Sequence, residues 1–269
     1  MIGATRARFR AYADAMADWD GEHYARTSDL QRTMATRAIE GLVLRPDDHL
    51  LDVGCGDGFI TRHLAEQLPD GRAVGVDASP RMIAKAAALD DHVQFVLADV
   101  LDMPFRAEFD VVVSFNALHW VRQQQRALGS IAVAARPGAR VLIQMVCAGD
   151  RPSLETVAME VAGSVRWVDR FASFAPPFLH VAPDEFPGLA ASAGLRVTRL
   201  SVEDLTWNFG THDTFAEWCG NGAGAWTDNL NPDDRQLFLE DWARAYEEVS
   251  GRPGLLRFTQ MRADLEVHR

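Results

Sequence analysis

The sequence contains no long apolar run, no paired cysteines and no cluster of basic residues. No apolar stretch reaches the roughly 18 residues that a membrane-spanning helix needs. The opening residues MIGATRARFR have no apolar segment after their arginines, so a secretory signal is not expected either. The three cysteines, Cys55, Cys147 and Cys219, are widely separated and odd in number, which argues against a disulfide framework. We therefore expect a cytoplasmic protein without a membrane partner.

Charge and motif content exclude further classes of function. The formal net charge of −11 repels phosphate backbones, so we expect a small-molecule or protein partner rather than a nucleic acid. The sequence has no H-E-x-x-H or H-x-x-x-H pair and no carboxylate cluster, so no metal site is predicted. With 48% hydrophobic and 24% charged residues, the chain has the composition of a globular protein.

Short apolar runs alternate with helical patterns in the first half of the chain. Strands are predicted at 49–53, 72–77, 93–99, 109–115 and 137–146, with helices at 59–68, 79–90 and 121–135. Ser79 and Pro80 are typical of a helix N-cap and of the first helical position. This order of elements indicates an α/β fold with a parallel sheet and helices on both faces.

The two ends of the chain add helices and two further strands. A helical pattern covers most of residues 5–40, and residues 221–232 are predicted to be a loop. The other elements predicted are a helix ending at Gly194, strands at 195–209 and 255–268, a helix opened by a Thr214–Glu217 capping box, and a helix at 233–249.

A glycine-rich loop follows the first predicted strand. The stretch LLDVGCGDGFIT, residues 50–61, places Gly54, Gly56 and Gly58 before a predicted helix. Such a loop can bring backbone close to a ligand, although a plain tight turn has the same composition. A dinucleotide-binding loop, G-x-G-x-x-G/A, would place the ring of Phe59 where a small residue is required. A phosphate-binding P-loop needs G-K-[ST], which is absent.

Acidic residues narrow the choice of ligand at this loop. Asp52, Asp77 and Asp99 each stand at the end of a predicted strand, and parallel sheets bind ligands at the edge where those ends meet. Asp52 and Asp57 would repel a phosphate but attract a sulfonium and an ammonium group. Asp77 can accept hydrogen bonds from both ribose hydroxyls, and Asp99 from the amine of adenine. The ligand that combines these groups is S-adenosylmethionine.

Four segments resemble the motifs of class I S-adenosylmethionine-dependent methyltransferases. They are LLDVGCGDG, VGVDASPRMIAKA, VLADV and ARPGARVLI, and they span about residues 49–146. The resemblance implies a Rossmann-like sheet of seven strands, mostly parallel with an antiparallel last strand, and a helical cap. It also implies that the cofactor is bound by Tyr24, Asp52, Gly54, Cys55, Gly56, Gly58, Asp77, Ala78, Met82, Asp99, Val100, Asn116 and Ala117. For Met82, packing in the core is an alternative.

We expect these parts to form a single structural domain. An N-terminal helical cap segment would cover residues 1–44, and the cofactor-binding core residues 45–146. Residues 147–269 would complete the sheet and supply cap insertions at about 147–185 and 210–254.

The segments outside the core indicate which group accepts the methyl. No N-P-P-[YF] or D-P-P-Y motif follows the fourth strand, so transfer to an adenine amine or to glutamine is not expected. WDGEHYARTSDLQR, FNALHWV and the tail from FAEWCGNGAGAW onward resemble trans-aconitate and juvenile hormone acid methyltransferases. That resemblance implies formation of the methyl ester of a small carboxylic acid. A carboxylate is already ionised at neutral pH and needs no base.

Three residues form the predicted catalytic group. The indole of Trp120 and the amide of Gln31 can donate hydrogen bonds to a carboxylate. His119 is a third donor or, in an alternative O- or C-methyltransferase of natural products, the base that deprotonates the acceptor. Each has a structural alternative, in the core for Trp120 and His119 and on a solvated helix face for Gln31. A non-catalytic protein that binds S-adenosylmethionine is a further alternative.

Aromatic segments are candidates for the wall of the acceptor site. VRWVDRFASFAPPFLH and WCGNGAGAW carry many rings, which favours a lipophilic or mixed acid; a tricarboxylic acid would require several arginines. Arg166 and Arg170 lie in the first segment, where they could instead face solvent. The rings could equally form the core of the cap. They are Trp167, Phe171, Phe174, Phe178, Trp218 and Trp226.

Overall fold

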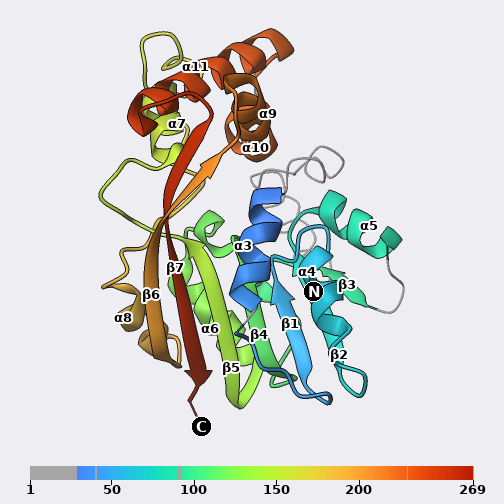
Figure 1. The fold of residues 1–269 in the computed structure, drawn as a ribbon. Helices are drawn as coiled ribbons and strands as arrows, with labels where there is room; N and C mark the ends of the chain where they lie inside the picture. Colours follow the sequence, from blue (N-terminus) through green and yellow to red (C-terminus); the bar gives the residue numbers. More distant parts are fainter. Residues whose placement is uncertain (1–28, 40, 90–92, 229, 269) are drawn as a thin grey trace.

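A computed structural model of the chain describes residues 29–39, 41–89, 93–228 and 230–268 (Figure 1). Its first helix, α3 (Asp29–Ile39), is the end of the helical segment predicted for residues 5–40, and the rest of that segment lies outside the described residues. Among the described helices, none combines the length and the apolar character that crossing a membrane requires.

Seven strands form one sheet in the order β3-β2-β1-β4-β5-β7-β6. The first five strands are parallel, and β7 is antiparallel to both of its neighbours. The fold class predicted from the sequence is therefore confirmed, including the reversed last strand. The strands are β1 (His49–Val53), β2 (Arg72–Asp77), β3 (Gln94–Leu97), β4 (Phe109–Phe115), β5 (Ala135–Val146), β6 (Leu195–Asn208) and β7 (Leu255–Val267).

Helices cover both faces of the sheet. Because side chains alternate along a strand, neighbouring residues pack on opposite faces. On β1, Leu50 packs in a cluster with Ile39 of α3 and Leu64 of α4 (Phe59–Ala65). The next residue, Leu51, packs in a second cluster that contains α6 (Gln124–Ala134) and α8 (Phe186–Ser192). Helix α5 (Pro80–Leu89) contacts β2 and β3. Near-continuous apolar runs such as those of β1 and β4 are typical of such doubly covered strands.

The strand order reverses between β1 and β4, which places their carboxyl ends at a switch point. β1 leads through α4 to β2 on one side, and β4, its neighbour on the other side, leads away through α6 to β5. In open α/β sheets the crevice beyond such a point binds ligands. The loops after β1, β2 and β4 therefore border the place where a ligand is expected.

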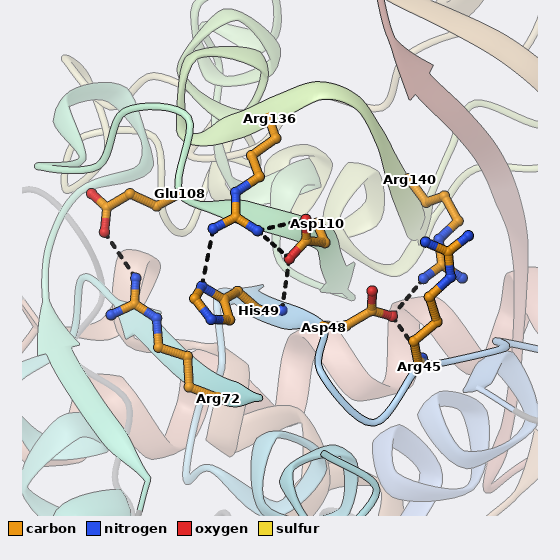
Figure 2. Close-up of polar contacts among 8 residues, drawn as sticks. All are labelled: Arg45, Asp48, His49, Arg72, Glu108, Asp110, Arg136 and Arg140. Carbon is orange, nitrogen blue, oxygen red and sulfur yellow. Dashed lines mark hydrogen bonds and ion pairs between the residues drawn. The ribbon is translucent and has the colours of Figure 1, made fainter. Parts of the chain in front are cut away.

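The amino-terminal ends of the strands, opposite that crevice, carry paired charges (Figure 2). Arg136 donates two hydrogen bonds to the Asp110 carboxylate, at 2.7 and 2.6 Å, and the backbone N–H of His49 donates a third, at 2.9 Å. Arg140 pairs with Asp48 at 2.6 Å. Each of these carboxylates thus has a cation within contact, and the pairs tie the starts of β1, β4 and β5 together.

A helical cap stands beyond the carboxyl ends of the strands. It consists of α7 (Leu154–Ala162), α9 (His212–Gly222), α10 (Gly224–Thr227) and α11 (Pro232–Ser250), together with residues 163–178. Figure 1 shows β6 and β7 continuing past the rest of the sheet to reach these helices. The cap has its own core, in which the side chains of Trp167, Trp226, Trp242, Phe215 and Phe238 are almost completely buried.

Local predictions differ from the structure at several places, some of them only in the bounds of an element. The capping box is wrong: Thr211 is the N-cap of α9, and its hydroxyl accepts from the backbone N–H of Thr214 at 3.2 Å. Residues 224–227 form α10 rather than a loop. The helix predicted at 121–135 begins only at Gln124 of α6, and residues 118–120 before it form a separate 3₁₀ turn, η2 (Leu118–Trp120). The Ser79 cap is confirmed, because its hydroxyl accepts from Met82 N at 3.3 Å.

Candidate active site

A cavity of about 260 Å³ lies between the carboxyl ends of the strands and the cap. Its wall has two parts. We call the lining residues between Asp52 and Val121 the loop side, and those from Val146 onward the cap side. Leu30 and Met34 of α3 also line it. The loop side contains eleven of the predicted cofactor residues: Asp52, Gly54, Cys55, Gly56, Asp77, Ala78, Met82, Asp99, Val100, Asn116 and Ala117.

The glycine loop is fixed by backbone hydrogen bonds to β2. Gly54 N and Cys55 N both donate to the carbonyl of Val76, at 2.8 and 2.9 Å. Gly54 has a φ of +76°, and a Cβ there would overlap the Cβ of Ala117. Gly56 has a φ of +55°, but a Cβ there would meet nothing within 4 Å. Gly54 is thus required by close packing as well as by conformation, whereas Gly56 leaves the loop open toward the cavity.

Gly58 serves a different purpose from the other two glycines. It does not line the cavity. Its φ is +74°, and a Cβ there would overlap the ring of Phe95 on β3. The third glycine therefore lets the start of α4 pack closely on the sheet.

Asp52 is a buried carboxylate at the floor of the loop side. Only 2% of its surface is exposed, and it accepts a hydrogen bond from the Thr61 hydroxyl at 2.6 Å. Burial raises the pKa of Asp52 to about 7, the bond from Thr61 lowers it in part, and the charge of Asp77 raises it further. A cation placed in the cavity would favour the ionised form of this group.

The other two predicted acids are held by backbone N–H groups. Asp77 accepts from Gly56 N at 2.9 Å and from Ser79 N at 2.8 Å, so one side chain connects the glycine loop with the start of α5. Asp99 accepts from Leu101 N at 2.9 Å. Burial raises the pKa of Asp99 above its ordinary value, against the lowering effect of that hydrogen bond.

Asn116 and Ala117 form the corner at the end of β4. Asn116 has a φ of +52°, unusual for a residue with a side chain. Its side-chain oxygen accepts from Gln260 Nε2 of β7 at 3.0 Å, and its backbone N–H donates to the carbonyl of Gln144 at 2.8 Å. Gln260 is 7% exposed and was not singled out from the sequence. A glutamine inside the apolar strand LLRFTQMRADL was the available signal, since buried amides require partners.

Of the three predicted catalytic residues, two line the cavity and one is only partly described. His119 and Trp120 belong to η2, and their rings lie 5.1 Å apart. Gln31 lies on α3 next to Leu30, but its side chain lies outside the described part. Tyr24 lies outside the described residues altogether.

His119 is buried and neutral. It is 4% exposed, and no described residue makes a hydrogen bond to its Nδ1. Burial lowers the pKa of His119 well below its ordinary value, with a smaller effect from His180. The imidazole therefore offers one donor and one acceptor at neutral pH.

The cap side of the cavity is largely apolar, but it is made by different residues from those expected. Of the six aromatic residues proposed from the sequence, only Trp218 lines the cavity. The other five pack in the cap core, where aromatic rings from α10 and α11 meet. Arg166 and Arg170 pair with Asp241 and Asp234 at the surface. The cap-side lining is Val146, Leu154, Glu155, Trp218, Cys219, Gly222, Trp242, Leu256 and Phe258.

Comparisons with known proteins agree on a family. A family model described as a methyltransferase domain matches residues 51–143. A trans-aconitate 2-methyltransferase of Streptomyces avermitilis is 32% identical over 59% of this chain and 61% of its own. One of Rhodopseudomonas palustris is 28% identical over 91% of this chain and 98% of its own. The structure of the YcgJ protein of Bacillus subtilis is 16% identical, with a TM-score of 0.65 over 88% of this chain and 99% of that one.

These findings support a class I S-adenosylmethionine-dependent methyltransferase. Its cofactor is S-adenosylmethionine, which carries a sulfonium and an ammonium charge together with a carboxylate.

The cavity of this methyltransferase fits a cationic cofactor. Four carboxylates line the loop side, those of Asp52, Asp57, Asp77 and Asp99. No arginine or lysine is among the described residues that line the cavity. The loop side therefore has the charge that a sulfonium requires, and the cap side provides apolar surface for a second molecule.

Proposed function

We propose that this methyltransferase forms the methyl ester of a small, largely apolar carboxylic acid. The observation that carries the proposal is the composition of the acceptor compartment. Apolar and aromatic side chains of α9, α11 and β7 enclose it, and the neutral His119 and Trp120 stand where it meets the loop side. In such a compartment the charge of one carboxylate is balanced by the sulfonium of the cofactor, and only neutral hydrogen-bond donors are needed to orient it.

The loop side supplies the cofactor contacts in this proposal. The open backbone at Gly56 faces the methionine moiety, and Asp77 accepts from the ribose hydroxyls while the loop N–H groups hold its carboxylate in place. Asp99, with Val100, receives the adenine edge. Met82 is 3% exposed and lines the cavity, so it packs in the core and presents one side to the adenine. Asn116 and Ala117 border the sulfonium.

Transfer is an in-line displacement at the methyl carbon. A carboxylate oxygen of the acid forms the new O–C bond, and the C–S bond breaks with its electron pair remaining on sulfur. The acid is ionised at neutral pH, so no proton moves. The negative charge of the carboxylate and the positive charge of the sulfonium both disappear in the step, and a compartment that excludes water favours such neutralisation. The residues contribute position: the indole N–H of Trp120 and the N–H of His119 direct the oxygen toward the methyl group.

Trans-aconitate itself fits this compartment poorly. The relatives named above are trans-aconitate 2-methyltransferases, and that substrate carries three carboxylates. Recognition of several carboxylates in a buried site ordinarily uses arginine. The described lining has neither arginine nor lysine, which supports an acid with one carboxylate.

A second candidate is a hydroxyl or carbon acceptor that His119 deprotonates. The unpartnered Nδ1 and the lowered pKa of His119 favour it, because the imidazole is neutral and able to accept a proton. The same low pKa means that both mechanisms predict a flat rate above pH 6.5. A His119→Asn variant separates them. It should retain most activity toward a carboxylate, but lose roughly 10²–10⁴-fold if the imidazole is the base.

The direct test is calorimetric titration with S-adenosylhomocysteine followed by a turnover screen of free acids, each paired with its amide. Turnover of acids but not amides is the expected result. Tight binding with turnover only of hydroxyl compounds would contradict ester formation and favour the second candidate. Binding with no turnover of any compound would indicate a protein that senses the cofactor.

A further inference from the structure

Glu155 is the one acidic residue on the described cap side of the cavity. It lies in the first turn of α7, just after the N-cap Ser153, whose hydroxyl accepts from Thr156 N at 3.1 Å. The side chain of Glu155 is 13% exposed. The four acids of the loop side surround the proposed cofactor site, whereas Glu155 stands among Leu154, Trp218 and other walls of the acceptor compartment. It therefore faces the acceptor rather than the cofactor.

No cation compensates this carboxylate within the described residues. Its ionic contact among the described residues is with His180, whose Nε2 lies 3.7 Å from Glu155 Oε2 and has no hydrogen-bond partner there. His180 does not line the cavity, and its ring packs on Phe178 at 4.7 Å. Burial lowers the pKa of His180 despite the opposing effect of Glu155, so the imidazole is neutral at pH 7. No hydrogen bond from a described residue to the Glu155 carboxylate is found, and Glu155 lines the cavity.

We infer that Glu155 determines which acids the enzyme accepts. Its carboxylate receives a hydrogen-bond donor, a hydroxyl or an ammonium group, at the end of the acceptor remote from the methylated carboxylate. It repels a second carboxylate at that end, because like charges brought together in an apolar site are strongly unfavourable. The substrate class is thus an acid with one carboxylate and a distant donor group. This inference rests on the proposed function, since it assumes an acceptor that is methylated on a carboxylate.

The test uses four acids of equal chain length, at several lengths, that end in a methyl, hydroxyl, ammonium or second carboxylate group. The proteins are the wild type, Glu155→Gln and the control Glu160→Gln, a change on the same helix at an exposed position outside the cavity. Calorimetry measures binding of each acid in the presence of S-adenosylhomocysteine. Ester formation then gives kcat/KM. An unchanged affinity for S-adenosylhomocysteine shows that each variant is folded.

We expect the wild type to prefer the hydroxyl- or ammonium-ended acid over the diacid by about tenfold or more. Glu155→Gln should reduce that preference by a similar factor, chiefly by admitting the diacid, while Glu160→Gln changes nothing. The ammonium-ended acid should lose affinity in Glu155→Gln, and the hydroxyl-ended acid should lose less, which distinguishes the two donors.

The outcomes separate this inference from ester formation itself. If binding shows the change of preference but no acid is methylated, the role of Glu155 stands and ester formation fails. If acids are methylated with the same ranking in all three proteins, ester formation stands and the role of Glu155 is overturned. If no member of the series binds any of the proteins, both proposals fail.

Discussion

The two edges of the sheet hold acidic residues in opposite circumstances. At the amino-terminal edge, Asp48 and Asp110 are each paired with an arginine, as Figure 2 shows. At the carboxyl edge, Asp52 lies four residues after Asp48 and is bonded to a neutral hydroxyl. Burial raises the pKa of Asp52 to about 7. Burial also acts to raise the pKa of Asp110, but the hydrogen bonds from His49 N and Arg136 outweigh it and lower the pKa.

This is the difference that we expect between residues that stabilise the fold and residues that bind a positively charged ligand. A paired carboxylate contributes stability to the folded chain, whereas a buried carboxylate without a cation is unfavourable until a positive group binds. Asp48, just before β1, and Asp52, within it, are thus acids of opposite kinds only four residues apart. Four substitutions test this contrast.

The largest effect is expected from Gly54→Ala. A Cβ at Gly54 would overlap the Cβ of Ala117, and the φ of +76° is strained for any residue with a side chain. The loop and the β4 corner would separate, so kcat/KM should fall on the order of 100-fold or more, because misplacement of the reactants is costly. The matched control is Gly129→Ala in α6, where a Cβ meets nothing within 4 Å and alanine favours the helix. Equal activity of the two variants would contradict the role given to Gly54.

Asp52→Asn should weaken cofactor binding and stabilise the protein without cofactor. The pKa of Asp52 is raised to about 7, so its protonated form is favoured in the fold; that contribution to stability is complete below about pH 4 and is lost as pH rises through 7. Asparagine keeps an acceptor for the Thr61 hydroxyl but does not ionise, so the variant does not lose stability as the pH rises. At pH 8 the variant should exceed the wild type in unfolding free energy by up to a few kcal/mol, and at pH 4 the two should agree.

Calorimetry with S-adenosylmethionine completes this test. Affinity for the variant should fall on the order of tenfold or more, because a buried counter-charge has been removed. In the wild type, affinity should decline as pH falls below 7 and Asp52 takes up a proton. An affinity that is independent of pH and of the substitution would show that Asp52 does not serve the cofactor.

Asp110→Asn should have the reverse effect. Removal of the carboxylate charge that pairs with Arg136 should destabilise the protein by about 1 kcal/mol, since the pair is partly exposed. Because the pKa of Asp110 is lowered, its contribution is present above about pH 4 and is lost as pH falls through the folded-state pKa. Denaturant titrations at pH 7 and pH 3 would measure this loss. Affinity for S-adenosylmethionine should stay at the wild-type value.

The smallest effect is expected from Glu108→Gln. Glu108 pairs with Arg72 at 2.9 Å, but both side chains are substantially exposed, at 38% and 44%. Solvent screens such a pair, so the unfolding free energy should change by no more than a few tenths of a kcal/mol. A thermal melt and a cofactor titration should both match the wild type. A clear loss of cofactor affinity would show that the amino-terminal edge also serves the site.

The sequence predicted the loop side of the site far better than the cap side. Gly54, Asp77 and Asp99 sit at strand ends, and parallel pairing brings strand ends together whatever the rest of the chain does. The bounds predicted for β1, β2 and β4 match the structure for the same reason, since buried strands are continuous apolar runs. The third glycine was recognised, but its contact with Phe95 was not.

The cap side could not be predicted from local patterns. Trp167 and Trp218 look alike in sequence, yet one is buried in the cap core and the other lines the cavity. Trp242 was not singled out, although it lines the cavity and its indole donates to the carbonyl of Leu154 at 2.8 Å. Which face of a helix meets the cavity depends on packing between segments distant in the chain.

The sequence alone therefore determined the sheet, the glycine loop and the acids that suit a sulfonium, because these follow from periodicity and from the ends of consecutive strands. Tertiary structure decided the walls of the acceptor compartment, the neutrality of His119 and the position of Glu155. Those properties arise from burial and from contacts among α7, α9, α11 and β7, of which α7 (Leu154–Ala162) is far in sequence from α9 (His212–Gly222) and the elements after it. They also arise from the desolvation that such packing imposes on charged groups.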